Sequence, residues 1–225
     1  MSNIFMKTLF IPRCIVCGKP ADADNLCNEC ARRLEKCRIP PDKQPLEKGV
    51  EWVDGIYASY YYRDRARDAL LRAKFKNPAS FLASVVKDVS GDIKPALDNN
   101  IHRIMRVPYH KSKLYESEFD LPCETGKRLR KEIDIPFITP VEKVRKTAKQ
   151  HDLPLAQRKA NLIDAFKVTG DVKDKNILII DDVMTTGITL SAVAFQLKLA
   201  GRAKVYRWVY TFNTMDKGEN SYGDK

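Results

Sequence analysis

Residues 177–189 read Ile177-Leu178-Ile179-Ile180-Asp181-Asp182-Val183-Met184-Thr185-Thr186-Gly187-Ile188-Thr189. The apolar run at the start predicts a strand over 176–181 that is buried on both faces, as in a parallel sheet. The residues at 188–200, closed by Gly201, predict a helix directly behind the turn. In open α/β sheets, ligands bind beyond the carboxyl ends of the strands, where these two aspartates stand.

Strands and helices are expected to alternate along the rest of the chain, which indicates a mostly parallel sheet covered on both faces. Further strands are predicted at 53–62, 101–107, 136–138, 165–168 and 204–212, and helices at 64–75, 78–97 and 121–133. A polar loop is expected at 109–120 and a mobile basic excursion at 142–159. The predicted fold class is therefore α/β.

The whole-chain composition limits the classes of protein. The 225 residues, 44% of them hydrophobic, suffice for one α/β domain with a small appendage. We divide them into a cysteine-rich unit with its linker, 1–45, and a main domain, 46–225. A net charge of +11 favours nucleic acid, phosphorylated small molecules or an acidic partner, and is equally compatible with a basic solvated surface.

Hydropathy and the N-terminus bear on location. No stretch of about 18 apolar residues occurs, so no membrane span is expected. The opening residues 1–14 are too short and too interrupted for a secretory signal, and paired cysteines follow at once. We therefore expect a cytoplasmic protein.

The turn after the strand combines two kinds of chemistry. The first N–H groups of the following helix and the hydroxyls of Thr185, Thr186 and Thr189 form a cup of donors for one phosphate. Gly187 has no Cβ, so the backbone can approach that phosphate closely. Asp181 and Asp182 can accept hydrogen bonds from the two hydroxyls of a ribose. Together these groups predict a site for a ribose 5-phosphate, whereas an acidic turn with a threonine cap would not require this set of residues.

This segment resembles the signature of type I phosphoribosyltransferases, and nearly the whole chain is similar to the ComF family. The resemblance rests also on Arg145-Lys146-Thr147, Gln150, Arg158, Asn161 and Phe166, and on Val107-Pro108-Tyr109-His110, which is similar to the start of the family's pyrophosphate loop. It implies a type I phosphoribosyltransferase-like domain behind an N-terminal zinc knuckle. It also implies a role in DNA uptake during natural transformation.

The resemblance further implies which residues hold phosphoribosyl pyrophosphate and Mg²⁺. Asp181 and Asp182 would hold the ribose and act in any catalysis. The remaining contacts are assigned to Val183, Met184, Thr185, Thr186, Gly187, Thr189, Tyr109, His110, Lys111 and Arg145. Where the family has Arg-Gly-Phe-Asn-Gln after its pyrophosphate loop, this chain has Ser117-Glu118-Phe119-Asp120-Leu121. A carboxylate there would repel pyrophosphate unless Mg²⁺ intervenes, which argues against catalysis and not against ribose phosphate binding.

Four of the six cysteines form two C-x-x-C pairs, Cys14/Cys17 and Cys27/Cys30, with nine residues between them. Two such pairs can close one tetrahedral metal site. A segment of about 25 residues cannot bury a useful core by itself, so the metal would supply its folding energy. Structural Zn²⁺ is expected, and an iron–sulfur cluster uses the same ligands.

Three functions follow from these features. The first is Mg²⁺-assisted binding of phosphoribosyl pyrophosphate in a protein of DNA uptake. The second is an active phosphoribosyltransferase that moves ribose 5-phosphate to an unidentified nitrogen acceptor in nucleoside metabolism. The third is a module that binds single-stranded DNA or a helicase-like competence partner and keeps a degenerate active site. The fold alone does not choose among them.

Overall fold

A four-stranded parallel sheet forms the centre of the molecule, with the strand order β1-β6-β5-β2. Its strands are β1 (Gly55–Tyr61), β2 (Arg103–Arg106), β5 (Asn176–Met184) and β6 (Lys204–Phe212). The structure is a computed structural model that describes residues 12–21, 25–46, 50–75, 93–109, 120–145, 164–184, 187–201 and 203–213. The predicted α/β class and parallel sheet are confirmed.

Both faces of the sheet are covered, because its interior strand β5 is apolar on both sides. Ile177 and Ile179 belong to one hydrophobic cluster, whereas Leu178 and Ile180 belong to the other, and all four are at most 1% exposed. Side chains alternate between the faces of a strand, so a continuous apolar run needs cover on both sides.

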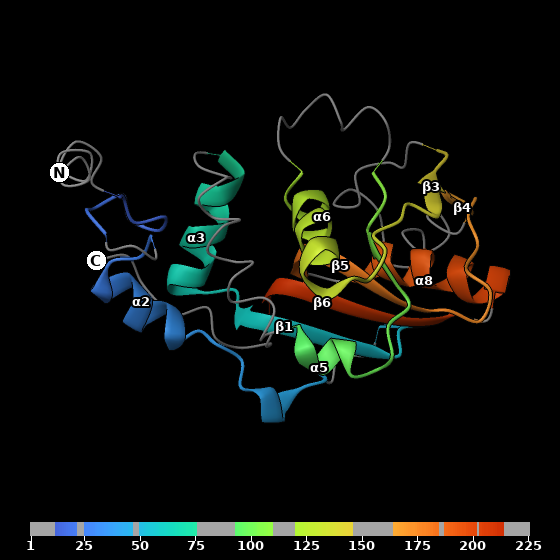
Figure 1. Ribbon diagram of the computed structural model, residues 1–225, viewed down its shortest axis with the longest axis horizontal. Helices are drawn as coiled ribbons and strands as arrows, with labels where there is room; N and C mark the ends of the chain where they lie inside the picture. The colour runs from blue at the N-terminus through green and yellow to red at the C-terminus, as the bar shows by residue number, and fades with distance from the viewer. Residues whose placement is uncertain are drawn as a thin grey trace, which may run out of the picture.

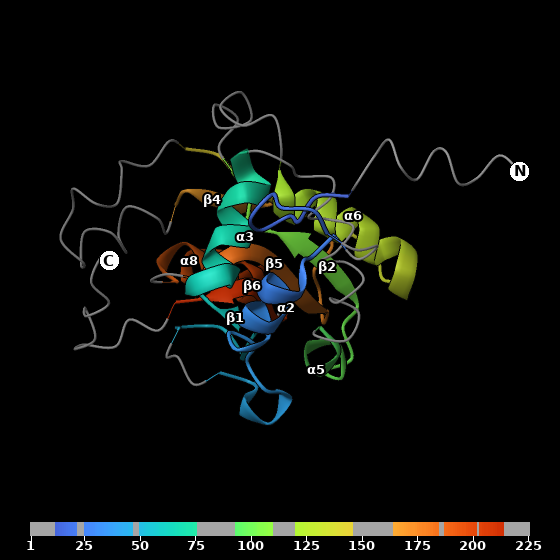
Figure 2. The ribbon, with the colours of Figure 1, turned by 90° about the vertical axis from the view of Figure 1, so that its left-hand side faces the viewer.

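Helices supply that cover. Side chains of α3 (Asp64–Phe75), α6 (Leu121–Ile133) and the turn that begins α5 (Lys94–Leu97) share a cluster with Leu178 and Ile180. The opposite face is covered by α8 (Ile188–Gly201) and by the antiparallel pair β3 (Val141–Lys143) and β4 (Phe166–Val168). Figure 2 shows α5 and α8 on opposite sides of the sheet. The result is a three-layer α/β arrangement.

The N-terminal segment packs at one end of this sheet. It contains α2 (Asn28–Glu35) and a 3₁₀ turn, η1 (Pro41–Lys43), before the chain enters β1. Figure 1 shows α2 beside α3, at the end of the sheet where β1 terminates. The segment therefore lies at the carboxyl ends of the strands, where ligands bind in such sheets.

Two predicted segments differ from the structure. The strand expected at 136–138 is reduced to one bridge, in which Phe137 pairs with Ile104 of β2. The excursion expected from residue 142 begins as β3, because this stretch pairs with β4. The rest of that excursion, residues 146–159, lies outside the described residues, as do 78–92 of the predicted second helix and most of the polar loop.

Candidate functional site

The two aspartates lie inside β5 and not after its end. The strand continues to Met184 because Val183 pairs with Thr211, and Met184 with Phe212, of β6. The side chains of Asp181 and Asp182 are 20% and 19% exposed, so both remain accessible. The expected end of this strand at 181 is thus three residues too early, since β6 offers partners for longer than the apolar run indicates.

Each carboxylate has a cationic partner. Asp181 Oδ2 accepts from Arg207 Nη2 at 2.5 Å, and its Oδ1 accepts from the backbone N–H of Asp182 at 2.9 Å. Asp182 Oδ2 forms an ion pair with Lys74 of α3, and its Oδ1 accepts from the N–H of Val183 at 2.7 Å. The acids are therefore held in fixed orientations and their charges are balanced.

Burial changes the acidity of this pair. Desolvation, together with the neighbouring charge of Asp182, raises the pKa of Asp181 to about 6 against the lowering effect of Arg207. A carboxylate with a pKa near 6 is ionised at neutral pH and is a strong acceptor for hydroxyl groups. The Asp181 carboxylate can therefore lose its charge in mildly acidic solution.

The start of α8 stands behind this strand. Gly187 has φ +73°, and a Cβ placed there would lie 2.8 Å from Val50 Cγ2. The carbonyl of Gly187 accepts from the N–H of Ser191 at 2.9 Å, so Gly187 caps the 14-residue helix. The free N–H groups of such a helix end attract anions. The absent Cβ makes room for the side chain of Val50, so the glycine is needed here for packing and for its positive φ.

A second polar group lies where β2 ends. Arg106 Nε is 3.0 Å from Asp120 Oδ2, and the Arg106 guanidinium lies 4.6 Å from the centre of the Tyr109 ring. Asp120 also caps α6 by accepting from the N–H of Cys123 at 3.0 Å. Burial first, and then the charges of Asp120, Asp181 and Asp182, raise the pKa of Tyr109, so its hydroxyl stays neutral. Tyr109 thus lies close enough to Asp181 and Asp182 for their charges to affect its pKa.

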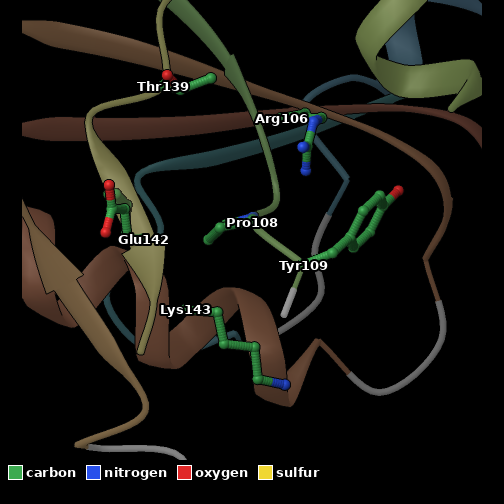
Figure 3. A pocket seen from close by; sticks show the side chains of 7 residues that line it. Arg106, Pro108, Tyr109, Thr139, Glu142 and Lys143 are labelled. Carbon is green, nitrogen blue, oxygen red and sulfur yellow. The ribbon is translucent and has the colours of Figure 1, made fainter. Parts of the chain in front are cut away.

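A cavity of about 240 Å³ adjoins this group. It lies between the end of β2 and β3, and its lining residues are Arg106, Pro108, Tyr109, Thr139, Val141, Glu142 and Lys143. Figure 3 shows Arg106 and Tyr109 beside each other on one wall, with Glu142 on the opposite wall. The cavity therefore presents both signs of charge to a polar ligand.

The other residues expected in the site divide into two sets. Met184 is fully buried, so it can offer a ligand only its backbone, whereas Val183 and Thr189 are partly exposed and Arg145 is exposed. The remaining expected residues lie outside the described residues: His110, Lys111, Thr185 and Thr186. Ser117 and Glu118 lie outside them as well.

The four paired cysteines converge. The Sγ atoms of Cys14, Cys17, Cys27 and Cys30 all lie within 4.8 Å of one another, and those of Cys17 and Cys27 are 3.7 Å apart. Four sulfurs about 2.3 Å from a tetrahedral zinc ion would be about 3.8 Å from one another. The cluster can therefore hold a metal ion, and its sulfur donors fit zinc.

Local structure explains this convergence. Cys14 and Cys17 flank a turn closed by Gly18, whose N–H donates to the Cys14 carbonyl at 2.8 Å with φ +80°. Cys27 begins α2, and Cys30 lies in its first turn. Burial opposes ionisation of Cys14, but hydrogen bonds from the backbone at Cys27, Cys17 and Val16 lower its pKa to about 6. A thiolate, the form that binds metals, is therefore favoured at Cys14, whereas burial and the neighbouring cysteines raise the pKa of Cys30.

The knuckle shares the core of the larger domain. Cys14 and Cys30 are each 1% exposed and belong to the same hydrophobic cluster as Leu70 of α3. A Cβ on Gly18 would lie 2.7 Å from Arg72 Nη2, also on α3. The cysteine cluster thus packs against α3, the helix that carries Lys74.

Comparison with known proteins identifies the chain. The sequence model of the phosphoribosyl transferase domain matches residues 126–224. The chain is 41% identical over 203 residues to the DNA utilization protein YhgH of Salmonella typhi, covering 87% of this chain and 82% of that protein. It is 28% identical over 199 residues, with the same coverage, to YhgH of Escherichia coli K12. The chain belongs to the ComF family.

Solved structures with a similar arrangement include the adenine phosphoribosyltransferase of Saccharomyces cerevisiae. The identity to that enzyme is 17%, the TM-score is 0.39, and the match covers 63% of this chain and 72% of that one. The domain of this ComF-family protein is of the phosphoribosyltransferase type. No helix in its described ranges is both long and apolar enough to pass through a membrane.

Sequence reasoning missed several charged residues of this candidate site: Lys74, Arg106, Asp120 and Arg207. Arg207 gave a signal, because a charged residue within the apolar and aromatic strand 205–210 requires a buried partner. Lys74 gave none, since it is one of many basic residues on α3. Its place beside Asp182 depends on the docking of that helix.

Proposed function

We propose that this ComF-family protein binds phosphoribosyl pyrophosphate together with Mg²⁺. The observation that carries the proposal is the pair Asp181 and Asp182 at the carboxyl end of β5, with Gly187 and the start of α8 behind it. The carboxylates would accept from the two ribose hydroxyls. The helix N-terminus and Thr189 would receive the 5-phosphate, as anions favour such helix ends.

Asp181 and Asp182 would hold Mg²⁺, which prefers oxygen ligands and would supply positive charge to offset that of the pyrophosphate. Tyr109, with its neutral hydroxyl, would donate a hydrogen bond to a phosphate oxygen. The family resemblance also assigns Arg145, Lys111 and His110 to the pyrophosphate end of the ligand.

Calorimetric titration with phosphoribosyl pyrophosphate, with and without Mg²⁺, tests the proposal. The parent should bind, and a nucleobase panel should show whether any ribosyl transfer follows. Turnover would show that the protein is also a transferase, in which a nitrogen nucleophile replaces pyrophosphate at C1 of the ribose. Binding without turnover is the result that we expect, because Ser117 and Glu118 replace the family's arginine and glycine.

A second function, contact with single-stranded DNA, is favoured by one surface. The outer side of α6 exposes a row of basic residues: Lys127, Arg128, Arg130 and Lys131. Such a row can follow a phosphate backbone, and its binding would weaken as salt rises. The name of the YhgH relatives, DNA utilization protein, accords with this role, and the protein would meet a helicase-like partner in DNA uptake.

Fluorescence anisotropy with a labelled single-stranded oligonucleotide separates the two sites. Arg128→Glu combined with Arg130→Glu should abolish DNA binding and leave phosphoribosyl pyrophosphate binding intact. Asp182→Asn should weaken phosphoribosyl pyrophosphate binding and leave DNA binding intact. If the α6 double variant and Asp182→Asn bind DNA equally, the α6 surface is not the DNA site.

A further inference from the structure

Lys74 brings a cation to the aspartates from a distant part of the chain. It lies in the last turn of α3, and its ammonium pairs with Asp182 Oδ2. Three neighbours on α3, Ala69, Leu70 and Ala73, are at most 1% exposed in the core, so the helix fixes the position of the Lys74 backbone. The Lys74 side chain is 34% exposed, more than that of its partner Asp182 at 19%.

The two arginines near the aspartates are more buried than Lys74 and are held by more contacts. The Arg207 side chain is 4% exposed and donates to both Asp181, at 2.5 Å, and the Val183 carbonyl, at 3.2 Å. Arg106 is 15% exposed and is held by Asp120 and the Tyr109 ring. Each of these arginine side chains is less exposed than that of Lys74 and has a second contact within the fold, so a ligand that drew it away would break two interactions. Lys74 pairs with Asp182, and it can leave that carboxylate when ligand hydroxyls take its place.

The positions of α3 and α8 on opposite faces of the sheet indicate how a bound ribose phosphate would be oriented. Asp182 follows Leu178 and Ile180 on the face covered by α3, whereas α8 covers the other face. A ligand whose 5-phosphate meets the start of α8 and whose diol meets the aspartates would extend its C1 end toward α3. The chemical group attached at C1 would then come within reach of the Lys74 ammonium.

We propose that Lys74 is a ligand-binding residue that selects compounds carrying phosphate groups on C1 of the ribose. This inference rests on the proposed function of the same site. Before binding, Lys74 neutralises Asp182. When the ribose hydroxyls take over that carboxylate, the ammonium moves to an oxygen of the pyrophosphate. Lys74 thereby replaces the cation that Ser117 and Glu118 do not provide.

The test compares phosphoribosyl pyrophosphate with ribose 5-phosphate, which lacks the C1 pyrophosphate, both with Mg²⁺. Titration calorimetry on the parent, Lys74→Met and Lys74→Arg gives the preference of each protein for the larger ligand. Arg67→Met is the matched control, because it removes a cation from the exposed side of the same helix. Melting temperatures verify that each variant is folded.

In Lys74→Met, the preference for phosphoribosyl pyrophosphate should fall by about tenfold or more, the usual worth of one charge-assisted hydrogen bond. Ribose 5-phosphate should bind as in the parent, Lys74→Arg should retain most of the preference, and Arg67→Met should retain all of it. An unchanged preference in Lys74→Met overturns the inference and leaves the proposed function standing. A parent that binds neither compound contradicts both.

Discussion

Arg207 Nη2 lies 2.5 Å from Asp181 Oδ2, between two strands of the central sheet. Arg207 is 3% exposed in a strand whose neighbouring side chains are apolar or aromatic. Its position on β6 pairs with Ile179, so the guanidinium extends along β5 to meet the carboxylate two residues further on. An ion pair thus stands at the point where the core ends and the candidate site begins.

Removing the guanidinium should destabilise the fold. Arg207→Met leaves the Asp181 carboxylate partly buried without a partner, which costs about 3–5 kcal/mol when one member of a buried pair is lost. The midpoint of urea unfolding should fall accordingly, and adding Asp181→Asn should recover part of the loss. Arg103→Met is the control, since Arg103 donates to the carbonyl of His102 and to no carboxylate in the described part of the chain. A midpoint equal to the parent's would mean that the pair contributes nothing.

Ligand affinity should depend on pH through Asp181. Its pKa, raised to about 6 chiefly by burial, means that the carboxylate is charged at pH 7.5 and largely neutral at pH 5. Affinity for phosphoribosyl pyrophosphate should therefore fall as the pH is lowered through 6. The fold itself gains from protonation of this group, because a raised pKa means tighter proton binding than in the unfolded chain. That contribution is present below about pH 4 and is lost as the pH rises through 6.

The ligand's phosphates also titrate near pH 6, so the comparison must be with Asp181→Asn, which has no carboxylate at that position. Titrations at several pH values should show a steeper loss in the parent than in this variant. The groups that face Asp181 are Arg207 on β6, the adjacent Asp182 with its partner Lys74, and Tyr109. Parallel pH profiles in the two proteins would show that Asp181 does not titrate in this range.

Metal binding by the four paired cysteines should stabilise the larger domain as well as the N-terminal segment. Purified protein should carry about one zinc ion per chain by elemental analysis, as four thiolates close one tetrahedral site. Cys14→Ser should release the metal and lower the melting temperature by about 4–8 °C, corresponding to about 2 kcal/mol for a chain of this size. The reason is that Cys14 lies in the core shared with α3.

Cys123→Ser is the control for this experiment, because Cys123 lies on α6 outside the cluster. Loosening confined to residues 13–38, with the parent's melting temperature, would instead indicate an independent knuckle. Iron found by elemental analysis in the freshly purified protein would mean that the four cysteines hold an iron–sulfur cluster and not zinc.

The cap of α8 offers a fourth test. Gly187→Ala places a side chain at φ +73°, which costs about 1–2 kcal/mol, and brings its Cβ against Val50. Both stability and affinity for ribose 5-phosphate should decrease. Adding Val50→Ala removes the contact but keeps the backbone strain, so it should restore stability only in part. Complete recovery would show that Gly187 is needed for space alone.

The sequence predicted some elements closely, and physical causes separate these from the rest. The apolar run Ile177–Ile180 and the helix at 121–133 were predicted from the local sequence, and the structure reproduces both. The C-x-x-C pairs likewise predicted a cluster that the structure brings together. The partners Lys74 and Arg207 come from α3 and β6, far from the signature in sequence. Their positions follow from how the layers pack, which no local pattern encodes.

The central claim is that Asp181 and Asp182 hold a ribose phosphate, and one calorimetric titration tests it most directly. Phosphoribosyl pyrophosphate with Mg²⁺ is titrated into the parent and into the double variant Asp181→Asn, Asp182→Asn. The variant should bind at least about tenfold more weakly, since each charged acceptor contributes about 1.5–3 kcal/mol. The control, Asp171→Asn with Asp174→Asn, removes two exposed charges before β5 begins and should bind like the parent. Equal affinity of the parent and the Asp181→Asn, Asp182→Asn protein would contradict the account.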